Sequence, residues 1–79
     1  MSDIEQALFR PDHVSVQDGV LTINVSYPYH IEMKRIASRD DILAWVAHLT
    51  EKTWMTQDVI CEFIFKAASA ADIELPKLP

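Results

Sequence analysis

The side chains in this sequence that could ligate a soft metal ion are three histidines and one cysteine: His13, His30, His48 and Cys61. Zinc sites place at least two of their ligands a few residues apart, because one short loop or helical turn must aim both at the same ion. None of these four residues lies that close to another along the chain. We therefore expect neither a metal site nor a bound cofactor.

A thiol enzyme would need Cys61 with a histidine base, for which His48 is the candidate. Cys61 lies in an apolar helical run, where thiols are commonly inert packing. His48 follows Trp45 by three residues and is typical of a half-buried, hydrogen-bonded histidine rather than a base. Asp40 and Asp41 do not form a catalytic pair, because successive helical residues point about 100° apart. These observations predict a protein that is not an enzyme.

Positive charge is concentrated at Lys34, Arg35 and Arg39. Cations this close together could bind a phosphate group. Acidic residues flank them, among them Glu32 and Asp40, so solvated ion pairs are the more ordinary interpretation. The chain offers no glycine-rich phosphate loop, because it contains 1 Gly.

Aromatic side chains gather around the segment that follows residue 45. Aromatics are enriched at protein-binding hot spots, but in a small domain they first of all fill the core, which is the favoured interpretation for Trp45. Trp54 lies in a turn, where burial is optional, so core and contact remain equally open, with a slight preference for the core. The candidate protein-binding residues are Trp54, Met55, Cys61, Phe65 and Ala68.

The elements that must position these residues follow from hydrophobic periodicity, which predicts an α+β fold. A three-stranded antiparallel meander is expected to pack against two C-terminal helices, after a short N-terminal helical turn in residues 2–12. Asp18-Gly19 is the dipeptide that most readily takes the positive φ angles of a tight hairpin. The predicted strands are 14–17, 20–25 and 29–36, and the side chains expected to face inward are Leu21, Ile23, Val25, Ile31 and Met33, with Ile36 on the opposite face.

The first of the two predicted helices spans about 39–51. Ser38 is its expected N-cap, with Asp40 and Asp41 in the first turn, where the helix dipole favours acids. An apolar stripe recurs at spacings of three and four residues and is expected to cover the sheet. Its members are Ile42, Leu43, Trp45, Val46 and Leu49.

The second predicted helix spans about 57–70, with Thr56 as N-cap. One apolar stripe comprises Val59, Ile60, Phe63, Ile64 and Ala67, and a second comprises Cys61, Phe65 and Ala68. Asp58, Glu62 and Lys66 are left as a narrow polar strip. A helix that is apolar on more than one side must be covered on both, either by the rest of the fold or by a second molecule.

Length and composition indicate a single small domain of 79 residues with 1 Cys and a net charge of -5. Its segments are an N-terminal segment (1–12), the meander (13–37), the two helices (38–70) and an extended tail (71–79). A domain this small is marginally stable, so oligomerisation is a reasonable expectation. The acidic balance disfavours nucleic acid as a partner, and the lone cysteine favours a reducing compartment. The acidic N-terminus and the lack of a long apolar run predict neither a secretory signal nor a membrane span.

Residues 29–64 resemble a pattern found in short uncharacterised bacteriophage and prophage proteins. In this pattern a strand ending in Arg-Ile precedes a helix reading Leu-x-Trp-Val-x-His-Leu, and Lys-Thr-Trp-Met-Thr follows. The matching residues are Arg35, Ile36, Leu43, Trp45, Val46, His48, Leu49, Lys52, Thr53, Trp54, Met55 and Thr56. The resemblance implies a small accessory protein of a phage or integrated element, in the cytoplasm of the bacterial host, with no catalytic role.

Three functional hypotheses follow. The preferred one is a non-enzymatic accessory protein that binds another protein and forms a homodimer. The first alternative is a host-defence inhibitor of the anti-CRISPR kind, whose acidic surface imitates nucleic acid. The second alternative is a helix-turn-helix regulator that reads DNA with residues 57–70, although that segment carries apolar residues where base-reading side chains belong.

Overall fold

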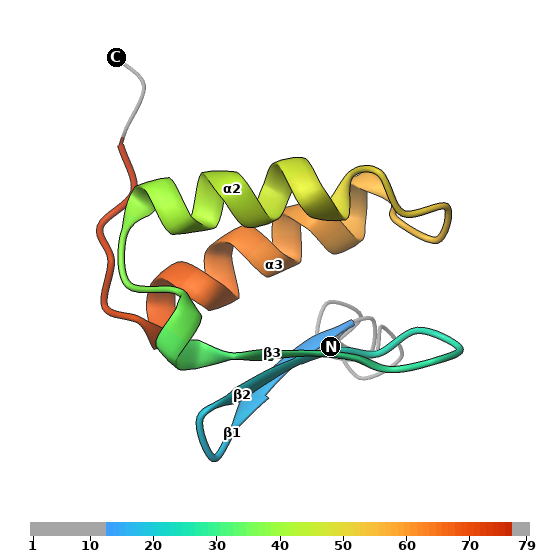
Figure 1. Ribbon diagram of the computed structural model, residues 1–79, viewed down its shortest axis with the longest axis horizontal. Coiled ribbons are helices and arrows are strands. Elements are labelled where there is room, and N and C mark those ends of the chain that lie inside the picture. Colours follow the sequence, from blue (N-terminus) through green and yellow to red (C-terminus); the bar gives the residue numbers. More distant parts are fainter. Residues whose placement is uncertain (1–12, 77–79) are drawn as a thin grey trace, which may run out of the picture.

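The computed structural model describes residues 13–76 and gives them the expected α+β fold (Figure 1). A three-stranded antiparallel sheet in the order β1-β2-β3 is followed by two long helices, which lie on one side of the sheet (Figure 1). The predicted N-terminal helical turn and the last three residues of the tail lie outside the described residues. The elements are β1 (Val14–Gln17), β2 (Val20–Ile23), β3 (Tyr29–Glu32), the 3-10 helix η1 (Met33–Arg35), α2 (Arg39–Leu49) and α3 (Gln57–Ala70).

The β1–β2 hairpin turns where the sequence predicted. Asp18 and Gly19 both have positive φ, at 54° and 77°, which is the backbone of a tight turn matched to the twist of the strands. Gln17 pairs with Val20 directly across this turn. This register places Val14 opposite Ile23, and both side chains are buried.

The third strand is shorter than predicted, because η1 replaces its second half. In a 3-10 helix the side chains repeat every three residues, so the two-residue alternation stops at Glu32. Ile36, which strict alternation placed on the outer face, is therefore buried, and Met33 is only half-buried. The second strand also ends early, at Ile23, and Val25 lies in the bend that follows.

Helix α2 begins at the predicted cap and ends two residues before the predicted end. The Ser38 hydroxyl accepts a hydrogen bond from the Asp41 amide at 3.2 Å, and the Asp41 carboxylate accepts one from the Ala37 amide at 2.9 Å. Of the predicted stripe, Ile42 and Leu49 are buried, while Leu43 is 67% exposed. Leu43 was wrongly included, because it lies about 100° around the helix from Ile42 and beyond the surface that α2 buries.

Helix α3 has the predicted bounds and the predicted cap, since the Thr56 hydroxyl accepts a hydrogen bond from the Val59 amide at 3.2 Å. Its C-terminus closes with Asp72 at a φ of 56°, and the Ile73 amide donates to the Ala68 carbonyl at 2.8 Å. This is the left-handed turn that satisfies the last helical carbonyls. Ile73 and Leu75 then pack against the core, so the described part of the tail returns to the domain.

The helix that covers the sheet is α3, whereas the sequence assigned this role to α2. Helix α3 lies against β1 and β2, and α2 packs on α3. The buried core consists of Val14, Leu21, Ile23, Ile31, Ile36, Ile42, Leu49, Val59, Phe63, Ala67 and Ala68. Within residues 13–76, no helix is long and apolar enough to cross a membrane.

Candidate functional site

One side of α3 carries a row of exposed residues without charge. Cys61, Phe65 and Ser69 follow one another at intervals of four, so they lie on one side of the helix, and all three are exposed. We call this row the α3 outer row. Phe65 is 66% exposed, and the Cys61 thiol is free and exposed. The expectation that Cys61 is inert packing is therefore wrong.

The other predicted binding residues lie elsewhere. Ala68 is 3% exposed and belongs to the core, because it lies on the flank of α3 that turns inward, so it cannot form part of a binding surface. Trp54 and Met55 are half-buried in the turn between α2 and α3 and pack against the core. This placement agrees with the slight preference for Trp54 as a core residue.

Two of the three residues in the polar strip of α3, Glu62 and Lys66, bind the start of β1, while Asp58 is exposed. The Glu62 carboxylate accepts hydrogen bonds from the backbone amides of His13 at 3.1 Å and Val14 at 2.9 Å. The Lys66 ammonium donates to the Val14 carbonyl at 2.6 Å and lies 3.0 Å from the Glu62 carboxylate. The ion pair on α3 thus forms hydrogen bonds with the backbone amides and carbonyl at the start of β1.

This arrangement changes the acidity of Glu62. Burial by itself raises the pKa of the Glu62 carboxyl, because it disfavours the charged form. The hydrogen bonds from Val14, Lys66 and His13, together with the charge of Lys66, outweigh burial and hold the pKa below its ordinary value. The charged form of Glu62 is therefore the form that the fold stabilises.

A second cluster joins α2, β3 and the turn after α2 through ring contacts. The ring centroids of Trp45 and His48 lie 5.7 Å apart, and those of Tyr29 and Trp54 also lie 5.7 Å apart. The His48 Nε2 and the Tyr29 hydroxyl form a hydrogen bond of 3.2 Å, which links the two pairs. The Lys52 ammonium lies 5.7 Å from the centroid of the Tyr29 ring. We call these five residues the aromatic cluster.

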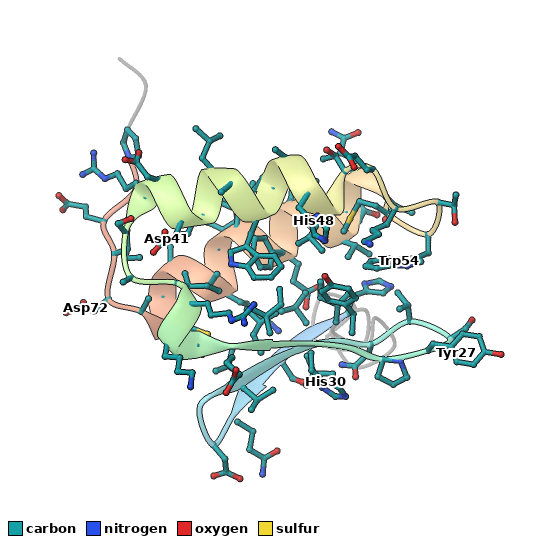
Figure 2. The ribbon with its side chains drawn as sticks, viewed as in Figure 1. Tyr27, His30, Asp41, His48, Trp54 and Asp72 are labelled. Carbon is teal, nitrogen blue, oxygen red and sulfur yellow. The ribbon has the colours of Figure 1, made fainter. Side chains whose placement is uncertain are left out.

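His48 is exposed, which differs from the expected half-buried position. Figure 2 shows its side chain directed from α2 toward the sheet, on the same face of the molecule as the Trp54 side chain. Cys61 is exposed on α3 and makes no contact with His48, so these two described residues do not form a nucleophile and base.

A cleft of about 440 Å³ opens beside the aromatic cluster, between β3 and α2. Its lining residues are Tyr29, Arg35, Ala44, Trp45 and His48. The cleft therefore combines three rings with one guanidinium group. No local pattern marked this cleft, because it forms where β3 meets α2, between residues as far apart along the chain as Tyr29 and His48.

Two exposed apolar side chains were also missed. Tyr27 is 89% exposed at the tip of the β2–β3 connection, where Figure 2 shows it projecting away from the domain. Leu43 projects from α2. The Tyr27-Pro28 dipeptide marked a break in the strand pattern, which could have indicated exposure at Tyr27.

Helix α3 lacks the features of a DNA-reading helix in the part of the chain that the structure describes. Its outer row is uncharged, Asp58 is exposed in its first turn, and Lys66 is engaged by the start of β1. This surface offers no positive charge to a phosphate backbone, which disfavours the helix-turn-helix hypothesis.

Residues 13–76 contain no group of three or more histidine, cysteine, aspartate or glutamate side chains placed to hold a metal ion. Comparisons of the chain with protein-family models, with curated proteins and with solved structures gave no match.

Proposed function

We propose that this chain is a small, non-enzymatic accessory protein of a phage or prophage that acts by protein–protein binding and forms a homodimer through the α3 outer row. The observation that carries the proposal is the exposure of Phe65 in the middle of that row. A large apolar side chain held on a rigid helix loses little conformational freedom on binding, so it suits an interface. The resemblance of residues 29–64 to phage and prophage proteins supports the origin and the host cytoplasm as the location.

The partner that this surface fits is a second copy of the chain. With a net charge of -5, two copies repel each other over most of their surface. The outer row is uncharged from Cys61 to Ser69, so it is a place where two copies can approach without juxtaposing like charges. A two-fold interface is self-complementary, and Phe65 of each protomer would pack near the Cys61 side chain of the other.

Sedimentation equilibrium at protein concentrations from about 1 µM to about 1 mM tests the homodimer, because weak protein interfaces associate in this range. We expect the wild-type protein to approach twice the monomer mass and the Phe65→Glu variant to remain monomeric. The matched control is Tyr27→Glu, which places the same charge on another exposed aromatic and should leave the association unchanged.

A crosslinking measurement locates the interface. Because Cys61 lies one helical turn from Phe65, a thiol-specific bismaleimide that spans a helical turn should join the Cys61 residues of the two protomers, and Phe65→Glu should abolish this crosslink. A wild-type protein that stays monomeric at the highest concentration would refute the homodimer. If both Phe65→Glu and Tyr27→Glu still captured the same nuclease or nucleoprotein complex from a host lysate, the host-defence inhibitor would replace this proposal.

A further inference from the structure

The two cations without an oxygen partner in residues 13–76 both adjoin Tyr29. The other three cations in this part of the chain are engaged: Lys34 lies 3.5 Å from the Glu32 carboxylate, Arg39 donates to the Glu74 carbonyl at 2.7 Å, and Lys66 binds Glu62 and Val14. Arg35 and Lys52 have no such partner. Arg35 lines the cleft beside Tyr29, and Lys52 lies over the Tyr29 ring.

No acidic side chain lines the cleft, although the protein as a whole is acidic. None of its five lining residues carries a carboxylate, while the chain has a net charge of -5. Asp40 and Asp41 lie one helical turn before Ala44 and Trp45 on α2, and neither lines the cleft. Figure 2 shows Asp41 near the opposite end of α2 from His48. Arg35 is therefore the one side chain lining the cleft that is charged at neutral pH, and its guanidinium group suits an anion.

The walls of the cleft suit a planar ring. Trp45, Tyr29 and His48 supply three ring surfaces, and the hydrogen bond of 3.2 Å between His48 and Tyr29 fixes two of them relative to each other. The T-shaped contact between Trp45 and His48 positions the indole ring. A volume of about 440 Å³ falls within the usual range for small-molecule sites. The rings are held in place before any ligand arrives, which reduces the entropic cost of binding.

We propose that this cleft binds a nucleoside monophosphate, with the base stacked on the Trp45 and Tyr29 rings and the phosphate bound by Arg35. A base presents a flat face to an aromatic platform, and a guanidinium group can donate two parallel hydrogen bonds to a phosphate. The phosphate carries close to two negative charges at neutral pH, and the second cation, Lys52, adds to the positive potential at Tyr29. A long nucleic acid strand is disfavoured, because its other phosphates would meet the acidic surface. This site is independent of the proposed homodimer, since it includes no residue of the α3 outer row.

Tryptophan fluorescence measures binding directly, because both tryptophans of the chain, Trp45 and Trp54, belong to the aromatic cluster. We expect adenosine monophosphate to change the emission in a saturable way, and one or more of the other three nucleoside monophosphates to do the same. Adenosine and inorganic phosphate should each bind about tenfold more weakly or worse, because each satisfies only half of the site. Amide shifts in an NMR titration should centre on residues 29, 35, 44, 45 and 48.

A matched pair of variants distinguishes binding in the cleft from non-specific attraction to positive charge. Arg35→Gln should weaken the binding of adenosine monophosphate about tenfold, because it removes a charge-assisted hydrogen bond. Lys34→Gln removes the same charge one residue earlier, outside the cleft, and should leave the affinity within about twofold. Both side chains are exposed, so both variants should keep the wild-type circular dichroism spectrum and melting temperature.

Three results would overturn the proposal. The first is the absence of a saturable fluorescence change with all four nucleoside monophosphates up to about 10 mM. A dissociation constant above this concentration is too weak for a useful ligand site. The second is an equal loss of affinity in Lys34→Gln and Arg35→Gln. The third is tighter binding of phosphotyrosine than of every nucleoside monophosphate, which would assign the cleft to a phosphorylated side chain instead.

Discussion

The two flanks of α3 invert the usual relation between polarity and burial. On one flank the ion pair of Glu62 and Lys66 is covered, with its oxygens and nitrogen bound to the backbone of His13 and Val14. On the other flank Phe65 lies 66% exposed. The polar flank meets the protein's own sheet, and the apolar flank is open.

The difference between the flanks reflects what each neighbour requires. Backbone groups at the start of a strand need hydrogen-bond partners, and a charged pair on a neighbouring helix supplies them. An apolar side chain needs only a surface to cover it, and residues 13–76 provide none over Phe65. The polar flank therefore holds the fold together, and the apolar flank is the part of the helix that residues 13–76 leave uncovered at Phe65.

Replacing each of two phenylalanines, two residues apart, with alanine tests this comparison most strongly. Phe63 is fully buried, so Phe63→Ala should cost about 4 kcal/mol of unfolding free energy, through lost burial and the cavity that remains. Phe65→Ala should change that free energy by less than about 0.5 kcal/mol, measured by urea unfolding of the monomer at low protein concentration. A comparable loss in both variants would show that Phe65 is already covered.

Trp54 extends the comparison to the turn between α2 and α3, where the sequence left burial and exposure open. It is half-buried against the core and lies 5.7 Å from the Tyr29 ring, so Trp54→Ala should cost about 3 kcal/mol. Tyr27→Ala is the control, because Tyr27 is an exposed aromatic and its removal should cost less than about 0.5 kcal/mol. A Trp54→Ala protein with unchanged thermal stability would reassign Trp54 to partner contact.

Local rules predicted the caps and turns of this fold from a few residues. Ser38, Thr56 and the Asp18-Gly19 pair each satisfy a backbone requirement within four residues of themselves, so the sequence contains both halves of the interaction. The bounds of α3 followed from the same kind of information. The α+β class followed from the change of period between the two halves of the chain.

The exposed outer row was only partly predictable. An apolar excess on α3 was visible in the sequence, and it included Cys61 and Phe65, which are exposed. Ala68 was assigned to the same stripe, but a stripe on a helical projection does not show where a neighbouring helix ends. Burial at Ala68 and exposure at Phe65 depend on how α3 meets its neighbours, which is a property of the tertiary fold.

Contacts across the fold were not predictable. The bond from Lys66 to Val14 joins residues 52 positions apart, and no local pattern marks it. The same holds for Tyr29 and His48, which are 19 positions apart. The replacement of the last strand residues by η1 moved Ile36 into the core, although strict alternation had placed it on the outer face.

The covered flank can be tested through the charge of Glu62. Glu62→Gln keeps the size of the side chain but removes the charge that accepts three hydrogen bonds, so it should cost about 2 kcal/mol at pH 7. Glu32→Gln removes an exposed carboxylate paired with Lys34 at 3.5 Å and should cost less than about 0.5 kcal/mol.

The pH dependence of that cost has a defined sign. Because the fold holds the pKa of Glu62 below its ordinary value, its contribution is fully present above the unfolded value of about 4.3 and is lost as the pH falls through the folded pKa. The gap between wild type and Glu62→Gln, measured by urea unfolding, should therefore narrow as the pH falls below about 4.3. A gap that widens under acid would contradict the assigned role of the carboxylate.

The smallest effect concerns the border between the covered and open parts of the apolar flank, at Cys61 and Ala68. Cys61→Ser replaces an exposed thiol with a hydroxyl that water can hydrogen-bond, so the unfolding free energy should change by less than about 0.5 kcal/mol. Ala68→Ser places a hydroxyl at a position that is 3% exposed and should cost about 1 kcal/mol, since burial removes the hydroxyl from water. Both substitutions produce a serine on the same helix, but only Ala68→Ser replaces the best helix former, so the difference reports burial only beyond a propensity loss of about 0.5 kcal/mol. A thiol reagent added to the wild-type monomer should modify Cys61 at the rate of an unfolded peptide, within about threefold, as expected for an open site. Slow modification, together with a large loss of unfolding free energy in Cys61→Ser, would show that Cys61 is buried within a single chain.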